Sequence, residues 1–126
     1  MDAKNRYSFA LFLLATLWSG CALQESDLPG RWQAVSFYQN GQQVQTPLDV
    51  VALDLLPDGR YQFQSQGFYR ENGTYHLSMF YLFLTDTTVQ PAKEHTVKIL
   101  YLSADSLKIR MQEAGKEQVL FFRRQK

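Results

Sequence analysis

The side chains best suited to bind a metal ion are few and far apart along the chain. His76 and His95 are its two histidines, and they fall on different predicted strands. A zinc site needs further ligands at tetrahedral geometry, but no cysteine ligand is available and no spacing of carboxylates suggests partners. We therefore predict no metal site and expect both histidines to be isolated surface residues.

Serines and glutamates give no stronger indication of catalysis. Ser78, Ser103 and Ser106 fall in predicted turns, where hydroxyl groups bond to the local backbone, and a nucleophile also needs a base and an oxyanion pocket. Glu71 and Glu94 could form an acid and base pair, but scattered glutamates on wet strand faces are ordinary. Since the sequence also lacks a glycine-rich phosphate loop, we predict a non-enzymatic protein without a cofactor.

The single cysteine suggests a different chemistry, because Cys21 directly follows an apolar run. A short basic head with Lys4 and Arg6 precedes the apolar segment FALFLLATLW at 9–18, and small residues follow it, which is the order of a secretory signal. The apolar run has about half of the ~20 residues that are needed to cross a bilayer. Residues 1–20 are therefore predicted to be a signal peptide and not a membrane span.

The segment LWSGC at 17–21 resembles the lipobox of bacterial lipoproteins, although Trp18 stands where leucine is usual. The resemblance implies that Cys21 is lipidated, carries acyl chains such as palmitate, and becomes the first residue of the mature chain. Two or more acyl chains make a stable membrane anchor, so we expect a lipoprotein of the bacterial cell envelope, most plausibly in the outer membrane. The alternative is that Cys21 is an apolar residue near an ordinary cleavage site.

The balance of basic and acidic side chains indicates whether a nucleic acid is a suitable partner. Without residues 1–20, the 13 basic and 12 acidic side chains fall to 11 of each. A nucleic-acid-binding protein normally carries a basic excess on one face to neutralise phosphates, and Arg123, Arg124 and Lys126 form only a small basic end. We therefore expect no nucleic-acid partner.

The sequence predicts that the candidate residues discussed above are positioned by β-strands. Past a short polar tether at 21–29, residues 30–126 alternate apolar and polar residues with period two, and no helical period is convincing. The clearest hairpin joins strands at 50–56 and 60–66 through Pro57, Asp58 and Gly59, whose residue types favour a tight turn. The other predicted strands cover 31–38, 69–77, 80–85, 95–102, 106–111 and 117–124.

Eight strands with mostly short turns predict an all-β fold. Parallel pairing would need long crossovers that this chain has no residues to build. Closure removes the two exposed edges of an open sheet. We therefore expect an eight-stranded antiparallel up-and-down meander that closes into a small barrel.

Five segments in this order, LPGRWQAVSFYQNG, LDLLPDGRYQF, ENGTYHL, YLSADSLKIR and FFRR, resemble the small lipocalin-like domain of secreted lipoproteins from Bacteroides-type bacteria. The resemblance covers nearly all of residues 28–125 and implies a lipocalin-like barrel. It also implies that Trp32 of the Gly30-x-Trp32 motif closes one end, with Arg123 or Arg124 from the last strand stacked on its ring. Such stacking stabilises by about 0.5 to 2 kcal/mol, and its role is structural.

A barrel of this size either fills with its own side chains or holds one small ligand. We predict a bulky interior with at most a shallow pocket at the open mouth, and a small hydrophobic ligand as the binding partner. The predicted inward residues are Trp32, Val51, Leu53, Leu55, Tyr61, Phe63, Tyr75, Leu77, Val97, Ile99, Tyr101, Leu107, Ile109, Met111, Val119 and Phe121. The predicted ligand contacts are Tyr38, Tyr61, Phe63, Phe68, Tyr75, Tyr81 and Tyr101.

Three segments are apolar on both faces, and they support an alternative function. Leu100, Leu102, Leu120 and Phe122 alternate with the predicted inward residues and would point outward. A contiguous outward apolar patch usually marks a contact surface. The alternative is therefore an interaction or accessory protein that docks a protein partner on its outer face, unless the tether or a loop covers these residues.

Overall fold

The computed structural model describes residues 23–65 and 69–125, so the predicted signal peptide, Cys21 and Phe68 lie outside the described residues. The described chain is almost entirely β-strand, as the alternation of apolar residues predicts. One short 3-10 helix precedes the strands. The elements are η1 (Glu25–Asp27), β1 (Gly30–Gln39), β2 (Gln42–Gln43), β3 (Ala52–Leu55), β4 (Arg60–Gln64), β5 (Arg70–Ser78), β6 (Tyr81–Asp86), β7 (Lys93–Leu102), β8 (Ser106–Glu113) and β9 (Lys116–Arg124).

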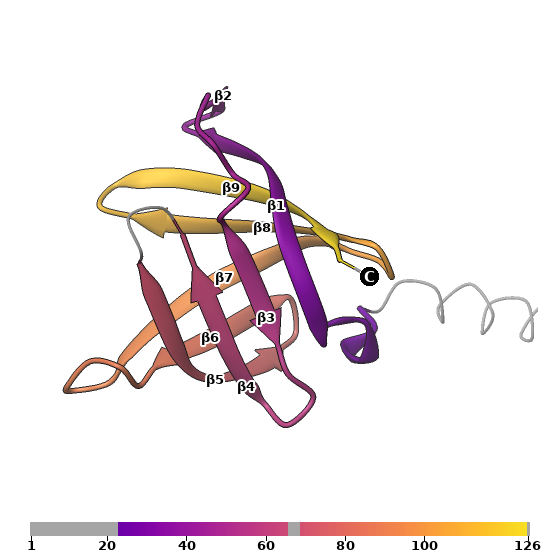
Figure 1. Cartoon of the computed structure of the whole chain (residues 1–126), viewed down its shortest axis with the longest axis vertical. Helices are drawn as coiled ribbons and strands as arrows, with labels where there is room; N and C mark the ends of the chain where they lie inside the picture. The colour runs from indigo at the N-terminus through magenta and orange to yellow at the C-terminus, as the bar shows by residue number, and fades with distance from the viewer. Residues whose placement is uncertain (1–22, 66–68, 126) are drawn as a thin grey trace, which may run out of the picture.

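The strands form one closed antiparallel sheet (Figure 1). Their order is β2-β1-β3-β4-β5-β6-β7-β8-β9, and β9 also pairs with β1, with Trp32 opposite Arg124 and Ala34 opposite Phe122. Eight strands therefore close the barrel, which confirms the predicted meander. The two-residue β2 is an addition that pairs with the end of β1.

The connections alternate between the two ends of the barrel, because each strand runs antiparallel to its neighbours. We call the end where β1 begins and β9 ends the base, and the opposite end the mouth. The turns after β3, β5 and β7 lie at the base. The longer connection at 44–51 and the connections after β4, β6 and β8 lie at the mouth.

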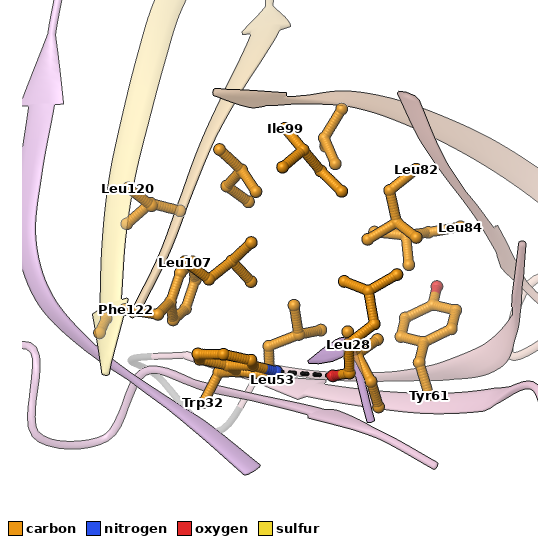
Figure 2. Packing of buried hydrophobic residues seen from close by; sticks show 14 of the residues in the cluster. Leu28, Trp32, Leu53, Tyr61, Leu82, Leu84, Ile99, Leu107, Leu120 and Phe122 are labelled. Carbon is orange, nitrogen blue, oxygen red and sulfur yellow. Dashed lines mark hydrogen bonds between the residues drawn. The ribbon is translucent and has the colours of Figure 1, made fainter. Parts of the chain in front are cut away.

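The base is closed by Trp32, which is fully buried. Its indole Nε1–H donates to the carbonyl oxygen of Leu28 at 2.9 Å, so the short segment with η1 is fixed across the barrel end (Figure 2). The guanidinium carbon of Arg124 lies 4.3 Å from the centre of the Trp32 ring. Gly30 leaves the space that this guanidinium occupies, since a Cβ atom there would lie 2.0 Å from Nη1 of Arg124.

The predicted orientation of β9 is wrong by one residue. Leu120 and Phe122 are buried in the core, while Val119 and Phe121 point outward. Both faces of this segment are apolar, so alternation alone could not choose between them, and a shift of one residue exchanges the faces of a strand. Arg124 decides the choice, because its contact with Trp32 places every second residue before it on the inner face.

Tyr101 is a second correction, since it is 56% exposed and not inward. The pairing of β7 with β8 shifts between Ile99 and Tyr101, which indicates a β-bulge. A bulge inserts one unpaired residue and reverses the alternation beyond it. As a result Leu102, not Tyr101, packs against the core.

Within the described residues, no helix has the length and apolarity to cross a lipid bilayer.

Candidate ligand cavity

The barrel contains a cavity of about 930 Å³ that opens at the mouth. Two of its lining residues, Leu84 and Leu120, lie on opposite sides of the view in Figure 2. Ligand pockets typically have volumes of about 300 to 1,000 Å³, so this cavity could hold a small molecule. The prediction of a filled interior with a shallow pocket is therefore wrong.

The predicted set of inward aromatic side chains is partly wrong, since Phe37 and Phe122 line the cavity. Tyr101 and Phe121 are on the outer face, as described above. Trp32 belongs to the floor of the barrel. Aliphatic side chains such as Leu53, Val97 and Ile109 form part of the wall.

Two of the seven predicted ligand contacts, Tyr61 and Phe63, line the cavity. The hydroxyl group of Tyr75 donates to the carbonyl oxygen of Leu56 at 2.7 Å, on the turn at the base. Phe68 lies outside the described residues.

The other three predicted contacts are corrections, because they lie away from the cavity. Tyr38 follows the inward Phe37 and packs edge-on against the outer Phe121, with 5.8 Å between ring centres. Tyr81 is 43% exposed, since Leu82 takes the inner face, and Tyr101 is displaced by the bulge. These tyrosines belong to the outer surface.

A polar group interrupts the apolar wall close to the mouth. Glu71 on β5 is only 6% exposed. Its Oε1 accepts a hydrogen bond of 2.5 Å from the hydroxyl group of Tyr61, and its Oε2 accepts one of 2.7 Å from that of Tyr69. Nε2 of His95 on β7 lies 3.5 Å from Oε1. The carboxylate is therefore fixed by three side chains.

Asp86 lies on β6, between the strands that carry Glu71 and His95. We call Glu71, Asp86 and His95 the mouth cluster. Asp86 is 4% exposed, and its Oδ1 accepts hydrogen bonds from N and Oγ1 of Thr88 at 2.9 and 2.5 Å. One ligand atom from each of the three residues lies within 4.8 Å of the other two. Two buried carboxylates and an imidazole thus share one small volume.

The surroundings of Glu71 keep both tyrosines protonated. Burial, followed by the hydrogen bond to Glu71, raises the pKa of Tyr61 well above its usual range. The hydrogen bond to Glu71, followed by burial, raises the pKa of Tyr69 to about 12. Both hydroxyl groups are therefore hydrogen-bond donors at neutral pH.

Gly73 makes the approach of Tyr61 possible. The two residues are opposite each other on β5 and β4. A Cβ atom on Gly73 would lie 3.0 Å from Cε1 of Tyr61 and 1.7 Å from the carbonyl oxygen of Thr85 on β6. The missing side chain leaves room for the aromatic ring, whose hydroxyl group can then reach Glu71.

Sequence reasoning missed the mouth cluster, although a signal for it was present. Leu77 and Tyr75 were placed on the inner face, and counting back by twos along the same strand reaches Glu71. Val97 and Ile99 place His95 inward in the same way. His76 is different, because it is on the exposed face and stacks on Phe83 at 4.8 Å between ring centres.

The outer apolar patch has other members than predicted. Leu120 and Phe122 belong to the core, so they cannot contribute. Leu100 is 37% exposed and lines a shallow groove on the outer face with Val35 and Tyr101. The groove is smaller than the inner cavity, at about 580 Å³.

These features define a small closed antiparallel β-barrel with one large inner cavity and a buried polar group near its mouth. No protein-family profile and no curated protein matches the sequence. Among solved structures, an uncharacterized protein from Bacteroides eggerthii has a similar fold, with a TM-score of 0.52 and 17% sequence identity over 77% of this chain and 98% of that chain. At this identity the likeness shows the fold alone.

Proposed function

We propose that the protein is a lipid-anchored lipoprotein of the bacterial cell envelope whose lipocalin-like barrel binds a small hydrophobic ligand. The observation that carries the proposal is the cavity of about 930 Å³, whose lining is largely apolar, both aliphatic and aromatic, and whose mouth is open. Transfer of each CH₂ group from water contributes about 0.8 kcal/mol. Each further CH₂ group that the cavity buries should therefore tighten binding about fourfold.

The anchoring part of the proposal comes from the lipobox resemblance at 17–21. Metabolic labelling with a palmitate analogue, followed by intact mass spectrometry, tests it in a bacterial host. We expect acylation of Cys21 and loss of the label in Cys21→Ser. Labelling that persists in Cys21→Ser, or an unacylated mature chain, would contradict it.

Ligand binding can be tested with the fluorescent apolar probe N-phenyl-1-naphthylamine. Leu120 lines the cavity from β9, two strands from His95 on β7, so Leu120→Trp should place a bulky ring inside the cavity and obstruct the probe. We expect wild-type protein to bind the probe with micromolar affinity and Leu120→Trp to bind at least 10-fold more weakly.

The matched control is Val89→Trp, because Val89 is exposed and outside the cavity lining. This variant should bind the probe like wild type, and circular dichroism should show that both variants fold. Absence of binding to wild-type protein, or equal affinities for all three proteins, would contradict the proposal.

Docking of a protein partner on the outer face has less support. Two of the four residues on which that alternative depended are buried in the core.

A further inference from the structure

We propose that the mouth cluster of Glu71, Asp86 and His95 binds a divalent transition-metal ion of the zinc class. The three residues come from the adjacent strands β5, β6 and β7 and are all on the inner face. This site is separate in chemistry from the apolar wall that would hold a hydrophobic ligand.

The distances suit such an ion. Zinc binds imidazole nitrogen and carboxylate oxygen at about 2.0 to 2.2 Å, so two ligand atoms in a tetrahedral site are about 3.4 Å apart. Nε2 of His95 and Oε1 of Glu71 are already 3.5 Å apart. Asp86 needs only a small side-chain movement, since its ligand atom lies within 4.8 Å of both.

The charges of the cluster also favour a cation. Glu71 and Asp86 are both more than nine-tenths buried, and burying a carboxylate is costly unless the charge is paired or binds a metal. Within residues 23–65 and 69–125, His95 is the one basic side chain in ion-pair contact with either of them. A divalent ion would compensate the second carboxylate.

Asp86 has an oxygen available for this role. Both hydrogen bonds from Thr88 are accepted by Oδ1, so Oδ2 takes part in neither of them. This arrangement orients the carboxylate from one side and leaves the other oxygen for a ligand.

Residues behind the cluster give it the support that metal sites usually have. Carboxylate ligands are commonly oriented by hydrogen bonds from an outer layer of residues. Tyr61 and Tyr69 donate to the two oxygens of Glu71, and each oxygen keeps a further lone pair. Because these groups sit on neighbouring strands of a closed sheet, the site is held by rigid elements.

The donor set selects the class of metal. Imidazole nitrogen suits zinc and similar transition metals, whereas magnesium and calcium prefer six or more oxygen ligands. Three protein ligands leave a fourth position for water or for a donor atom of a bound ligand. Glu71 and His95 line the cavity, so this position is reached from the mouth.

Isothermal titration of chelator-stripped mature protein with zinc chloride tests the proposal, with Cys21→Ser in every sample to remove the thiol. We expect one equivalent of zinc with a Kd of about 1 μM or lower, a rise in thermal stability on binding, and no binding of magnesium at the same concentration. Glu71→Gln, Asp86→Asn and His95→Gln should each weaken zinc binding at least 10-fold.

The controls carry the same chemical changes outside the cluster. Glu94→Gln and His76→Gln alter exposed residues, and both should bind zinc like wild type. Glu71→Gln and Asp86→Asn each lose hydrogen bonds, so circular dichroism of the metal-free variants should confirm the wild-type β-sheet spectrum before zinc binding is compared. Absence of zinc binding, or equal weakening by the control variants, would overturn the proposal.

The outcome is distinguishable from that of the apolar-probe experiment. Leu120→Trp should lose the probe and keep zinc, whereas the three cluster variants should lose zinc. A cobalt-loaded sample provides a second readout, since tetrahedral Co²⁺ absorbs visible light strongly. A spectrum unchanged by Asp86→Asn would contradict its assignment as a ligand.

Discussion

The side chain of Arg124 links the N-terminal and C-terminal segments of the described chain at the base of the barrel. Its guanidinium group covers Trp32 and donates to the carbonyl oxygens of Asp27, Pro29 and Ala104. A planar guanidinium can reach several acceptors at fixed angles, whereas a lysine ammonium group cannot replace it. The side chain thus stabilises the base from three directions.

Arg124→Ala should lower the free energy of unfolding by about 3 kcal/mol, because it removes a cation–π contact and charged hydrogen bonds. Arg124→Lys should recover only a small part of the loss. Urea unfolding followed by circular dichroism measures both values. Arg123→Ala is the control, since Arg123 is exposed and its change should stay within about 0.5 kcal/mol. Equal effects of the two alanine variants would contradict the assigned role.

Tyr75 makes stability depend on alkaline pH. Burial, followed by the charges of Glu25 and Asp58, raises its pKa above the usual value of 10.0. The folded protein therefore keeps this proton where the unfolded chain loses it, so the contribution is complete below pH 10 and is lost as the pH rises further.

We expect Tyr75→Phe to flatten the decline in stability above pH 10. At neutral pH it should cost about 1 kcal/mol, because the hydrogen bond to Leu56 is lost. Urea midpoints at pH 8 and pH 11 test this, with Tyr101→Phe on the exposed face as the control. A steeper decline in Tyr75→Phe than in wild type would contradict the expectation.

At the residue scale, the sequence allowed part of the interior to be predicted. Val97, Ile109 and Tyr61 line the cavity as alternation indicates. Glu71 and His95 obey the same alternation, but their polarity was taken to mean exposure. The alternation of apolar residues is enough to place Glu71 on the inner face. That Tyr61, ten residues earlier, donates a hydrogen bond to Glu71 is known only from the fold.

At the element scale, the period of apolar residues predicted nearly every strand. It could not predict the two bulges, between Ala34 and Ser36 on β1 and between Ile99 and Tyr101 on β7. A bulge adds one residue without changing the composition of a strand. On β7 both faces are apolar from Ile99 to Leu102, so the sequence held no second signal there.

The segment with η1 behaves as part of the barrel core, although it lies outside the sheet. Leu28 is 1% exposed, and we expect Leu28→Ala to cost about 2 to 5 kcal/mol, since it leaves a cavity over Trp32. Urea unfolding provides the measurement. Leu100→Ala, on the outer face, should cost less than about 1 kcal/mol. A small effect of Leu28→Ala would mean that the base does not depend on this segment.

At the scale of the whole molecule, closure by β1 and β9 means that the barrel has no edge strand among its eight main strands. The backbone amide of Gln125 donates to the carbonyl oxygen of Arg31, so the two ends of the described chain meet at the base. Adjacent termini generally permit circular permutation.

A circular permutant should therefore fold. We would join residue 125 to residue 23 by a linker of about eight residues and open the chain between Ala114 and Gly115, in the β8–β9 turn. We expect a circular dichroism spectrum like that of the wild type. The free energy of unfolding should fall by about 1 to 2 kcal/mol, because the added linker must be closed into a loop. Opening instead between Ile109 and Arg110, inside β8, should prevent folding. Equal folding of both permutants would contradict the closed arrangement.

The place where the tether joins the barrel sets the direction in which the protein would face. Leu23 packs against the core near the base, and only Ala22 separates it from Cys21. Under the proposed anchoring, a short link to Leu23 would keep the closed end near the lipid headgroups, and Met79 on the β5–β6 turn at the same end is 80% exposed. Under the proposed function, the opening would then point into the aqueous space, so a ligand would enter the barrel from water and not laterally from the bilayer.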